Sequence, residues 1–192
     1  MRTDRGATCS HPAATCGRTR VYFEKVTDLD NFDDLLAANR TYSESFDMNG
    51  FDGIAKAGVL MVTCMDSRLD PLGMIGLKPG DAKFLRNPGG RVEDDVLKAI
   101  VLSIAALNVD RVLIVEHTRC AMGSSSEAEL QAKIGTKNGV DATWLSLDVI
   151  NDQAATLTAD VHKVRSHPLV PENVKVGGFL YDVDTGLLKH IA

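Results

Sequence analysis

The fold is decided by the stretch Ala57-Gly58-Val59-Leu60-Met61-Val62-Thr63-Cys64-Met65-Asp66-Ser67-Arg68. Its first seven residues form a short, mainly apolar run with several β-branched side chains, which is typical of a strand buried in a parallel sheet. Such a strand would end at Cys64 and place Asp66 and Arg68 directly beyond its carboxyl end.

Working outward, the remaining pattern alternates strands and helices. Apolar periodicity predicts helices at 27–45, 93–107, about 124–134 and 148–166, and strands at 82–85, 111–115, 174–183 and 187–191. Asp28 or Asp30 could cap the first helix, and Ser124-x-x-Glu127 predicts a capping box. The last two strands would form a hairpin. Strands that alternate with helices predict an α/β fold with a mainly parallel central sheet flanked by helices.

Two further candidate metal ligands, His117 and Cys120, follow the predicted strand 111–115. Together with Cys64 they form a Cys-His-Cys set that suits Zn²⁺ and leaves one coordination position open for chemistry. Ligands of open α/β sheets bind beyond the carboxyl ends of the strands, where the strand order reverses, so the fold and the metal hypothesis indicate one place. Taken singly, each cysteine could be a buried apolar residue, and His117 a satisfied core histidine.

Asp66 and Arg68 are close enough in sequence to form a bidentate ion pair, which would keep the carboxylate ionised. The alternative is an ordinary solvated ion pair. The loop 86–90, Arg-Asn-Pro-Gly-Gly, is either a plain turn or a loop whose backbone N–H groups line an anion site. Trp144 is expected to pack rather than to contact a cofactor.

With these motifs in view, the chain resembles the β-class carbonic anhydrases from about Phe32 to His190. The residues that carry the resemblance are Cys64-x-Asp66-x-Arg68, the Arg-Asn-x-Gly loop and His117-x-x-Cys120. The resemblance implies a sheet of four or five strands, a homodimer or tetramer, and an N-terminal helix that packs on the partner subunit.

The resemblance also implies a zinc lyase, with Zn²⁺ bound by Cys64, His117 and Cys120. The implied reaction is reversible hydration of CO₂ to bicarbonate by a zinc-bound hydroxide, which a dyad of Asp66 and Arg68 would orient. One alternative is a carbonyl sulfide or carbon disulfide hydrolase that uses the same site, and another is a zinc-bearing protein without catalysis.

Two positions depart from the family pattern. Pro88 stands where alanine is common in the loop, and it removes one backbone donor. Ala121 follows Cys120 where glycine is usual. Both would touch the rim of the pocket, so they bear on the choice of substrate rather than on metal binding.

Charge and apolar content are ordinary for a soluble globular protein. The 192 residues carry a net charge of -5, which argues against a nucleic-acid partner. Residues 1–25 are basic, which is compatible with a transit peptide, a disordered tail or a misplaced start. We expect disorder there and a single zinc-dependent catalytic domain over 26–192. Cys9, His11 and Cys16 fit no standard zinc spacing. The absence of a secretory apolar segment predicts a cytoplasmic location.

Overall fold

The computed structural model describes residues 32–192. The chain divides into two compact units, Met1–Asn49 and Gly50–Ala192. In the described part of the first unit, helix α1 spans Asp33–Glu44 and has no buried residue. The predicted basic leader, the candidate caps Asp28 and Asp30 and the Cys9-His11-Cys16 group lie outside the described residues.

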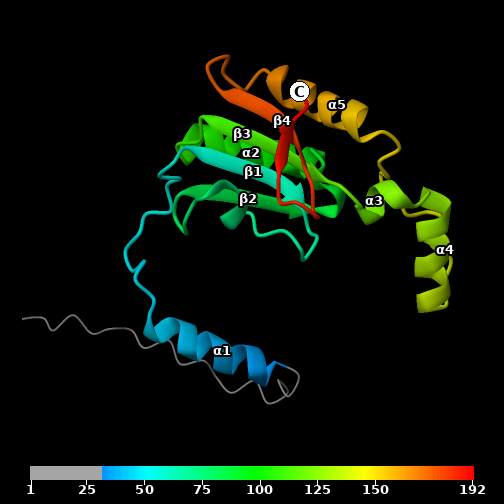
Figure 1. Cartoon of the computed structure of the whole chain (residues 1–192), viewed down its shortest axis with the longest axis horizontal. Helices are drawn as coiled ribbons and strands as arrows, with labels where there is room; N and C mark the ends of the chain where they lie inside the picture. Colours follow the sequence, from blue (N-terminus) through cyan, green and yellow to red (C-terminus); the bar gives the residue numbers. More distant parts are fainter. Residues whose placement is uncertain (1–31) are drawn as a thin grey trace, which may run out of the picture. The chain divides into compact units, whose positions relative to one another are not determined.

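The second unit is built on a five-stranded sheet with the order β2-β1-β3-β4-β5 (Figure 1). The first four strands are parallel, and β5 is antiparallel to β4. This confirms the predicted mainly parallel α/β sheet. The strand order reverses between β1 and β3, so their carboxyl ends flank the switch point of the sheet. The strands are β1 Val59–Cys64, β2 Ala82–Asn87, β3 Arg111–His117, β4 Lys175–Tyr181 and β5 Leu188–His190.

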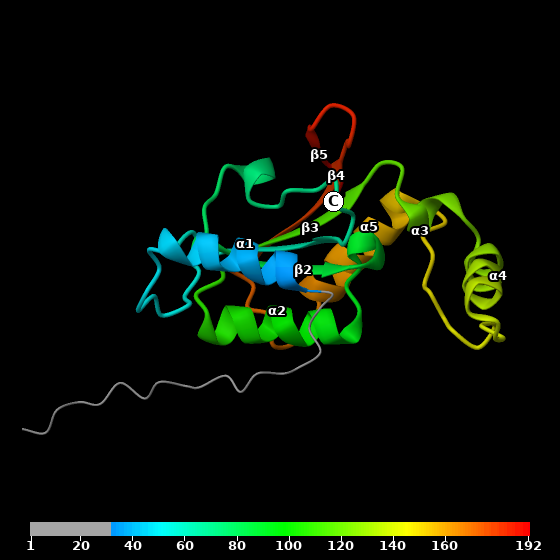
Figure 2. The same ribbon diagram turned by 90° about the horizontal axis from the view of Figure 1, so that it is seen from below.

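Helices α2 (Asp94–Ala106) and α5 (Gln153–Arg165) cover one face of this sheet. Ile100 of α2 and Leu157 of α5 belong to the same buried cluster as Leu60 of β1 and Ile114 of β3. Figure 2 shows α2 running along one side of the strands. None of the helices within residues 32–192 combines the length and apolar character needed to cross a bilayer. The shorter elements are the 3-10 turns η1 Gly73–Ile75 and η2 Pro88–Gly90 and the helices α3 Ala121–Ser124 and α4 Glu127–Asn138.

Three local predictions are wrong. The capping box that opens α4 pairs Ser126 with Glu129, because the short helix α3 already occupies Ser124. Helix α5 begins at Gln153 rather than near Asp148, because the Asp152 carboxylate accepts a hydrogen bond from the Ala155 N–H and caps the helix there. Trp144 does not pack in a core, since 79% of it is exposed.

Candidate metal centre

Cys64, His117 and Cys120 converge at the carboxyl edge of the sheet. Cys64 ends β1, His117 ends β3, and Cys120 immediately precedes α3. One donor atom from each lies within 4.8 Å of the other two, and the two sulfur atoms are 3.9 Å apart. All three residues are buried. The group is therefore a possible metal site, assembled from residues that are 56 positions apart in sequence.

The chemistry of the three donors fits a cation. A hydrogen bond from the Cys120 thiol to the Cys64 sulfur lowers the pKa of Cys64. The same hydrogen bond, together with burial, raises the pKa of Cys120. Two neighbouring thiolates would repel each other, and a cation between them would remove that conflict. His117 Nδ1 lies 2.9 Å from the Thr118 carbonyl oxygen, so it carries the proton and donates to it. The other ring nitrogen, Nε2, is buried without a hydrogen-bond partner among the described residues and is free to bind metal.

The glycine-containing turn η2 holds the Cys64 end of β1. Gly90 has φ +74°, and a Cβ atom there would lie 3.0 Å from the Cys64 nitrogen and 2.8 Å from the Val115 oxygen. Only glycine allows this close approach of the backbone. The Asn87 side chain closes the turn by accepting from the Arg91 N–H and donating to its carbonyl. Pro88 is accommodated at the start of the turn, where no helical donor is needed.

Asp66 and Arg68 form a bidentate pair beside the three donors. Arg68 Nε lies 2.9 Å from Asp66 Oδ1, and Arg68 Nη2 lies 2.7 Å from Oδ2. The Arg68 guanidinium holds the pKa of Asp66 well below its usual range, so the carboxylate is ionised at neutral pH. Asp66 Oδ2 is 3.8 Å from His117 Nε2, which places it next to the point where the donors converge.

Arg86, near the end of β2, also contacts the backbone of this loop. Its Nε donates to the Cys64 carbonyl at 3.0 Å and its Nη2 donates to the Asp66 carbonyl at 2.6 Å. The candidate anion-lining loop thus uses its arginine to fix the turn 64–68.

Comparison with known proteins agrees with this geometry. The sequence profile of the carbonic anhydrase family matches residues 59–188, which is more than half of the chain. The chain belongs to the β-carbonic anhydrase family. This confirms the resemblance and makes the family's zinc dependence the relevant precedent for the Cys-His-Cys group.

The names of individual relatives refer to two different activities. β-Carbonic anhydrase 1 of Mycobacterium tuberculosis is 30% identical over 163 residues, which cover 83% of this chain and 96% of the relative. A carbon disulfide hydrolase of Acidithiobacillus thiooxidans is 31% identical over 147 residues, or 66% of this chain and 73% of the relative. The crystal structure of carbonic anhydrase from Streptococcus mutans superposes with a TM-score of 0.76 at 34% identity, covering 84% and 97% of the two chains.

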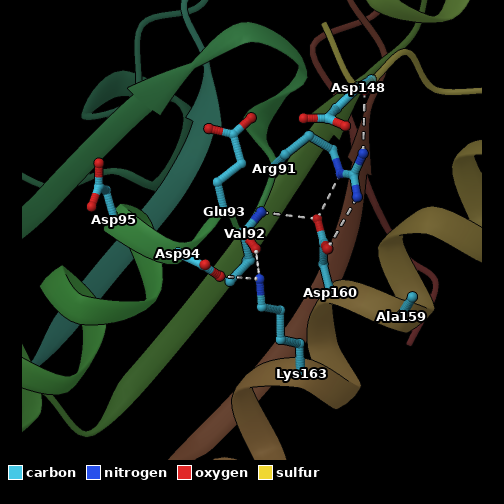
Figure 3. Close-up of a pocket in the computed structure, with 9 residues that line it drawn as sticks. All are labelled: Arg91, Val92, Glu93, Asp94, Asp95, Asp148, Ala159, Asp160 and Lys163. Carbon is cyan, nitrogen blue, oxygen red and sulfur yellow. Dashed lines mark hydrogen bonds and ion pairs between the residues drawn. The ribbon is translucent and has the colours of Figure 1, made fainter. Parts of the chain in front are cut away.

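A second group of charged residues, which includes the buried Asp160, was not predicted from the sequence. Asp160 of α5 accepts from Arg91 Nε at 2.8 Å and from the Val92 N–H at 3.0 Å (Figure 3). Arg91, Val92 and Asp160 all line a polar cavity of about 590 Å³, and none of the five predicted site residues lines it.

Glu116, next to His117, is fully buried, and burial raises its pKa to about 7. The only sequence signal for it is a charged residue between Val115 and His117 in an apolar strand.

Proposed function

We propose that this protein catalyses the reversible hydration of CO₂ with Zn²⁺ bound by Cys64, His117 and Cys120. The observation that supports this most directly is the convergence of those three donors within 4.8 Å beside a carboxylate, in a member of the carbonic anhydrase family. Two sulfur ligands and one nitrogen ligand match the preference of zinc, and three protein ligands leave a position for a reactant. Bound zinc would act as a Lewis acid that lowers the pKa of a water molecule toward neutrality.

The role that we propose for Asp66 follows from its charge and its partners. Its carboxylate is ionised at neutral pH and has no proton to donate, so it accepts a hydrogen bond from the reacting water at Oδ2. The Arg68 guanidinium fixes the plane of that carboxylate through two parallel hydrogen bonds. A fixed acceptor selects one orientation of the water molecule, so that a lone pair rather than an O–H bond faces CO₂.

Two substitutions test this assignment. Cys64→Ser should lose most of the zinc, because a thiolate ligand is removed. Asp66→Ala should retain zinc but lose about 100-fold or more in turnover, the range usual for a positioned proton acceptor. Asp70→Ala is the matched control, since Asp70 is an exposed carboxylate in the same loop. Zinc content and stopped-flow CO₂ hydration are measured on the same samples. Full activity of the Asp66→Ala protein would refute the dyad.

Hydrolysis of carbon disulfide or carbonyl sulfide is the second candidate. It is favoured by the 31% identity to a protein named carbon disulfide hydrolase. Both substrates are linear, with a central carbon open to attack, so the same metal site and the same Asp66 acceptor would serve. Release of sulfide from either substrate, measured on the zinc-quantified protein used for CO₂ hydration, separates the two. Efficient sulfide release with slow CO₂ hydration would assign the protein to the hydrolases.

We further propose that the protein works as a homodimer or tetramer. Helix α1 and the residues that follow it leave large apolar side chains exposed, with 62% of Leu35, 58% of Tyr42 and 49% of Phe46 accessible. Association between copies would bury such a surface. Light scattering coupled to size exclusion should therefore show a dimer or larger species, and Leu35→Glu should shift it toward the monomer. A wild-type monomer at micromolar concentration would contradict this.

A further inference from the structure

Thr118 and Arg119, which lie between two of the proposed zinc ligands, contact the turn of the C-terminal hairpin. The Thr118 N–H donates to the Tyr181 carbonyl at 2.9 Å. The Thr118 hydroxyl accepts from the Val183 N–H at 3.1 Å and donates to Asp182 Oδ1 at 3.4 Å. The linker between the ligands is therefore fixed to the strand and the turn that follow it in the sheet.

The hairpin turn is itself held in shape by Asp182. Asp182 Oδ1 also accepts from the Asp184 N–H at 2.9 Å, and the Asp182 carbonyl accepts from the Gly186 N–H at 2.8 Å. Asp184 in turn pairs with Arg119 Nη2 at 2.5 Å. The hydroxyl of Thr118 therefore bonds to a turn that is held in shape by its own hydrogen bonds.

The two carbonyls of the linker have separate partners in the site. The Thr118 carbonyl accepts from His117 Nδ1 at 2.9 Å, which leaves Nε2 facing the cysteines. The Arg119 carbonyl accepts from Arg68 Nη2 at 3.2 Å, the same nitrogen that pairs with Asp66. Arg119 has φ +54°, a left-handed backbone conformation that residues other than glycine rarely adopt. The contacts at Thr118 and Arg119 hold the linker in this conformation, which directs the Thr118 carbonyl to His117 and the Arg119 carbonyl to Arg68.

We infer that Thr118 is a positioning residue of the metal centre. The hydroxyl of Thr118 ties the linker 118–119 to the hairpin turn 182–186. The linker in turn sets the orientation of the His117 ring and the position of the Arg68 guanidinium. This inference rests on the proposed metal site but not on the identity of the substrate. Groups that orient metal ligands without touching the metal commonly alter metal affinity when they are removed.

Thr118→Val and Thr118→Ser form the test pair. Valine keeps the shape of threonine but removes both hydrogen bonds of the hydroxyl, whereas serine keeps the hydroxyl. We expect Thr118→Val to weaken zinc binding by about 10- to 100-fold, and Thr118→Ser to remain within about threefold of wild type. The matched control is Thr143→Val, because the Thr143 hydroxyl also bonds to a carboxylate, Asp141, but lies far along the chain from the ligands.

Zinc affinity is measured by competition with a chromophoric chelator. The absorption spectrum of the cobalt-substituted protein reports ligand geometry directly. Thr118→Val should change the cobalt bands, and the Thr118→Ser and Thr143→Val proteins should not. Wild-type zinc affinity and an unchanged cobalt spectrum in Thr118→Val would overturn the inference.

A folding defect in Thr118→Val would not leave the question open. Asp184→Asn alters only an exposed partner of the same turn, and we expect it to weaken zinc binding in the same direction by a smaller factor. Wild-type affinity in that variant, together with a misfolded Thr118→Val, would also refute the inference. CO₂ turnover is not a readout here, so a zinc-loaded wild type without activity would refute the proposed function alone.

Discussion

Gly90→Ala tests the close approach of the turn η2 to the strand that ends at Cys64. An added Cβ at this position would lie 2.8 Å from the Val115 oxygen, 3.0 Å from the Cys64 nitrogen and 3.0 Å from the Thr63 carbonyl carbon. All three are backbone atoms of β1 and β3, so no side chain can rotate away to make room. Relief requires that the turn or the two central strands move.

The expected loss of stability has two parts. Gly90 has φ +74°, and alanine in this left-handed conformation costs about 1–2 kcal/mol. Forcing a methyl group into a packed site costs about 1–3 kcal/mol more. The free energy of unfolding should therefore fall by about 2–5 kcal/mol, a large share of the roughly 5–15 kcal/mol that is typical of a domain.

Gly76→Ala is the matched control for the conformational part. Gly76 has φ +67°, but a Cβ there would meet no atom within 4 Å, so only the cost of the backbone conformation remains. Both substitutions restrict the unfolded chain equally, and that effect cancels in the difference. Urea unfolding at one protein concentration should separate the two variants by about 1–3 kcal/mol. Equal stabilities would show that the turn does not press on the strands as described.

Three further predictions concern buried charge and the metal. Asp160→Asn should lower the free energy of unfolding by about 3 kcal/mol or more, because the mostly buried Arg91 guanidinium loses its buried counter-charge. Asp95→Asn removes one partner of an exposed ion pair and should change stability little. Similar losses for the two variants in urea unfolding would contradict this. Because the pKa of Glu116 is raised to about 7, the unfolded state releases this proton first as the pH rises. Stability should then fall by roughly 3 kcal/mol between about pH 4.5 and 7, and Glu116→Gln should flatten that fall in unfolding curves taken at pH 5 and 7.5. Chelation of zinc should lower the melting temperature of the wild type but not that of Cys64→Ser, since metal stabilises only the state that binds it.

The sequence predicted the sheet and the location of the site because both depend on local patterns. The apolar, β-branched run before Cys64 and its counterpart before His117 each form a buried parallel strand. Parallel strands have their carboxyl ends at one edge of the sheet, so metal-binding side chains at the ends of neighbouring strands lie close together there. The strand order confirms that β1 and β3 are neighbours.

Features that depend on contacts between distant segments could not be predicted in the same way. Asp160 has an ordinary helical environment in the sequence, and only the contact of α5 with the segment that follows η2 brings it to Arg91, 69 positions away. Trp144 looks like a core residue by composition, yet its loop packs on α4, which itself has no buried residue. The start of α5 differs from the prediction for a local reason, because Asp152 rather than an earlier residue caps the helix.

The His-x-x-Cys spacing acquires its meaning from the backbone between its ends. A helix would place these two side chains three residues apart on one face and would satisfy the intervening carbonyls within itself. Here His117 ends a strand, Cys120 opens a short helix, and Arg119 turns the chain through a left-handed conformation. The carbonyls of the linker are consequently free to accept from His117 and Arg68. The motif therefore indicates which atoms can bind a metal, whereas the hairpin turn, through Thr118, determines how those atoms and the Asp66–Arg68 pair are oriented relative to each other.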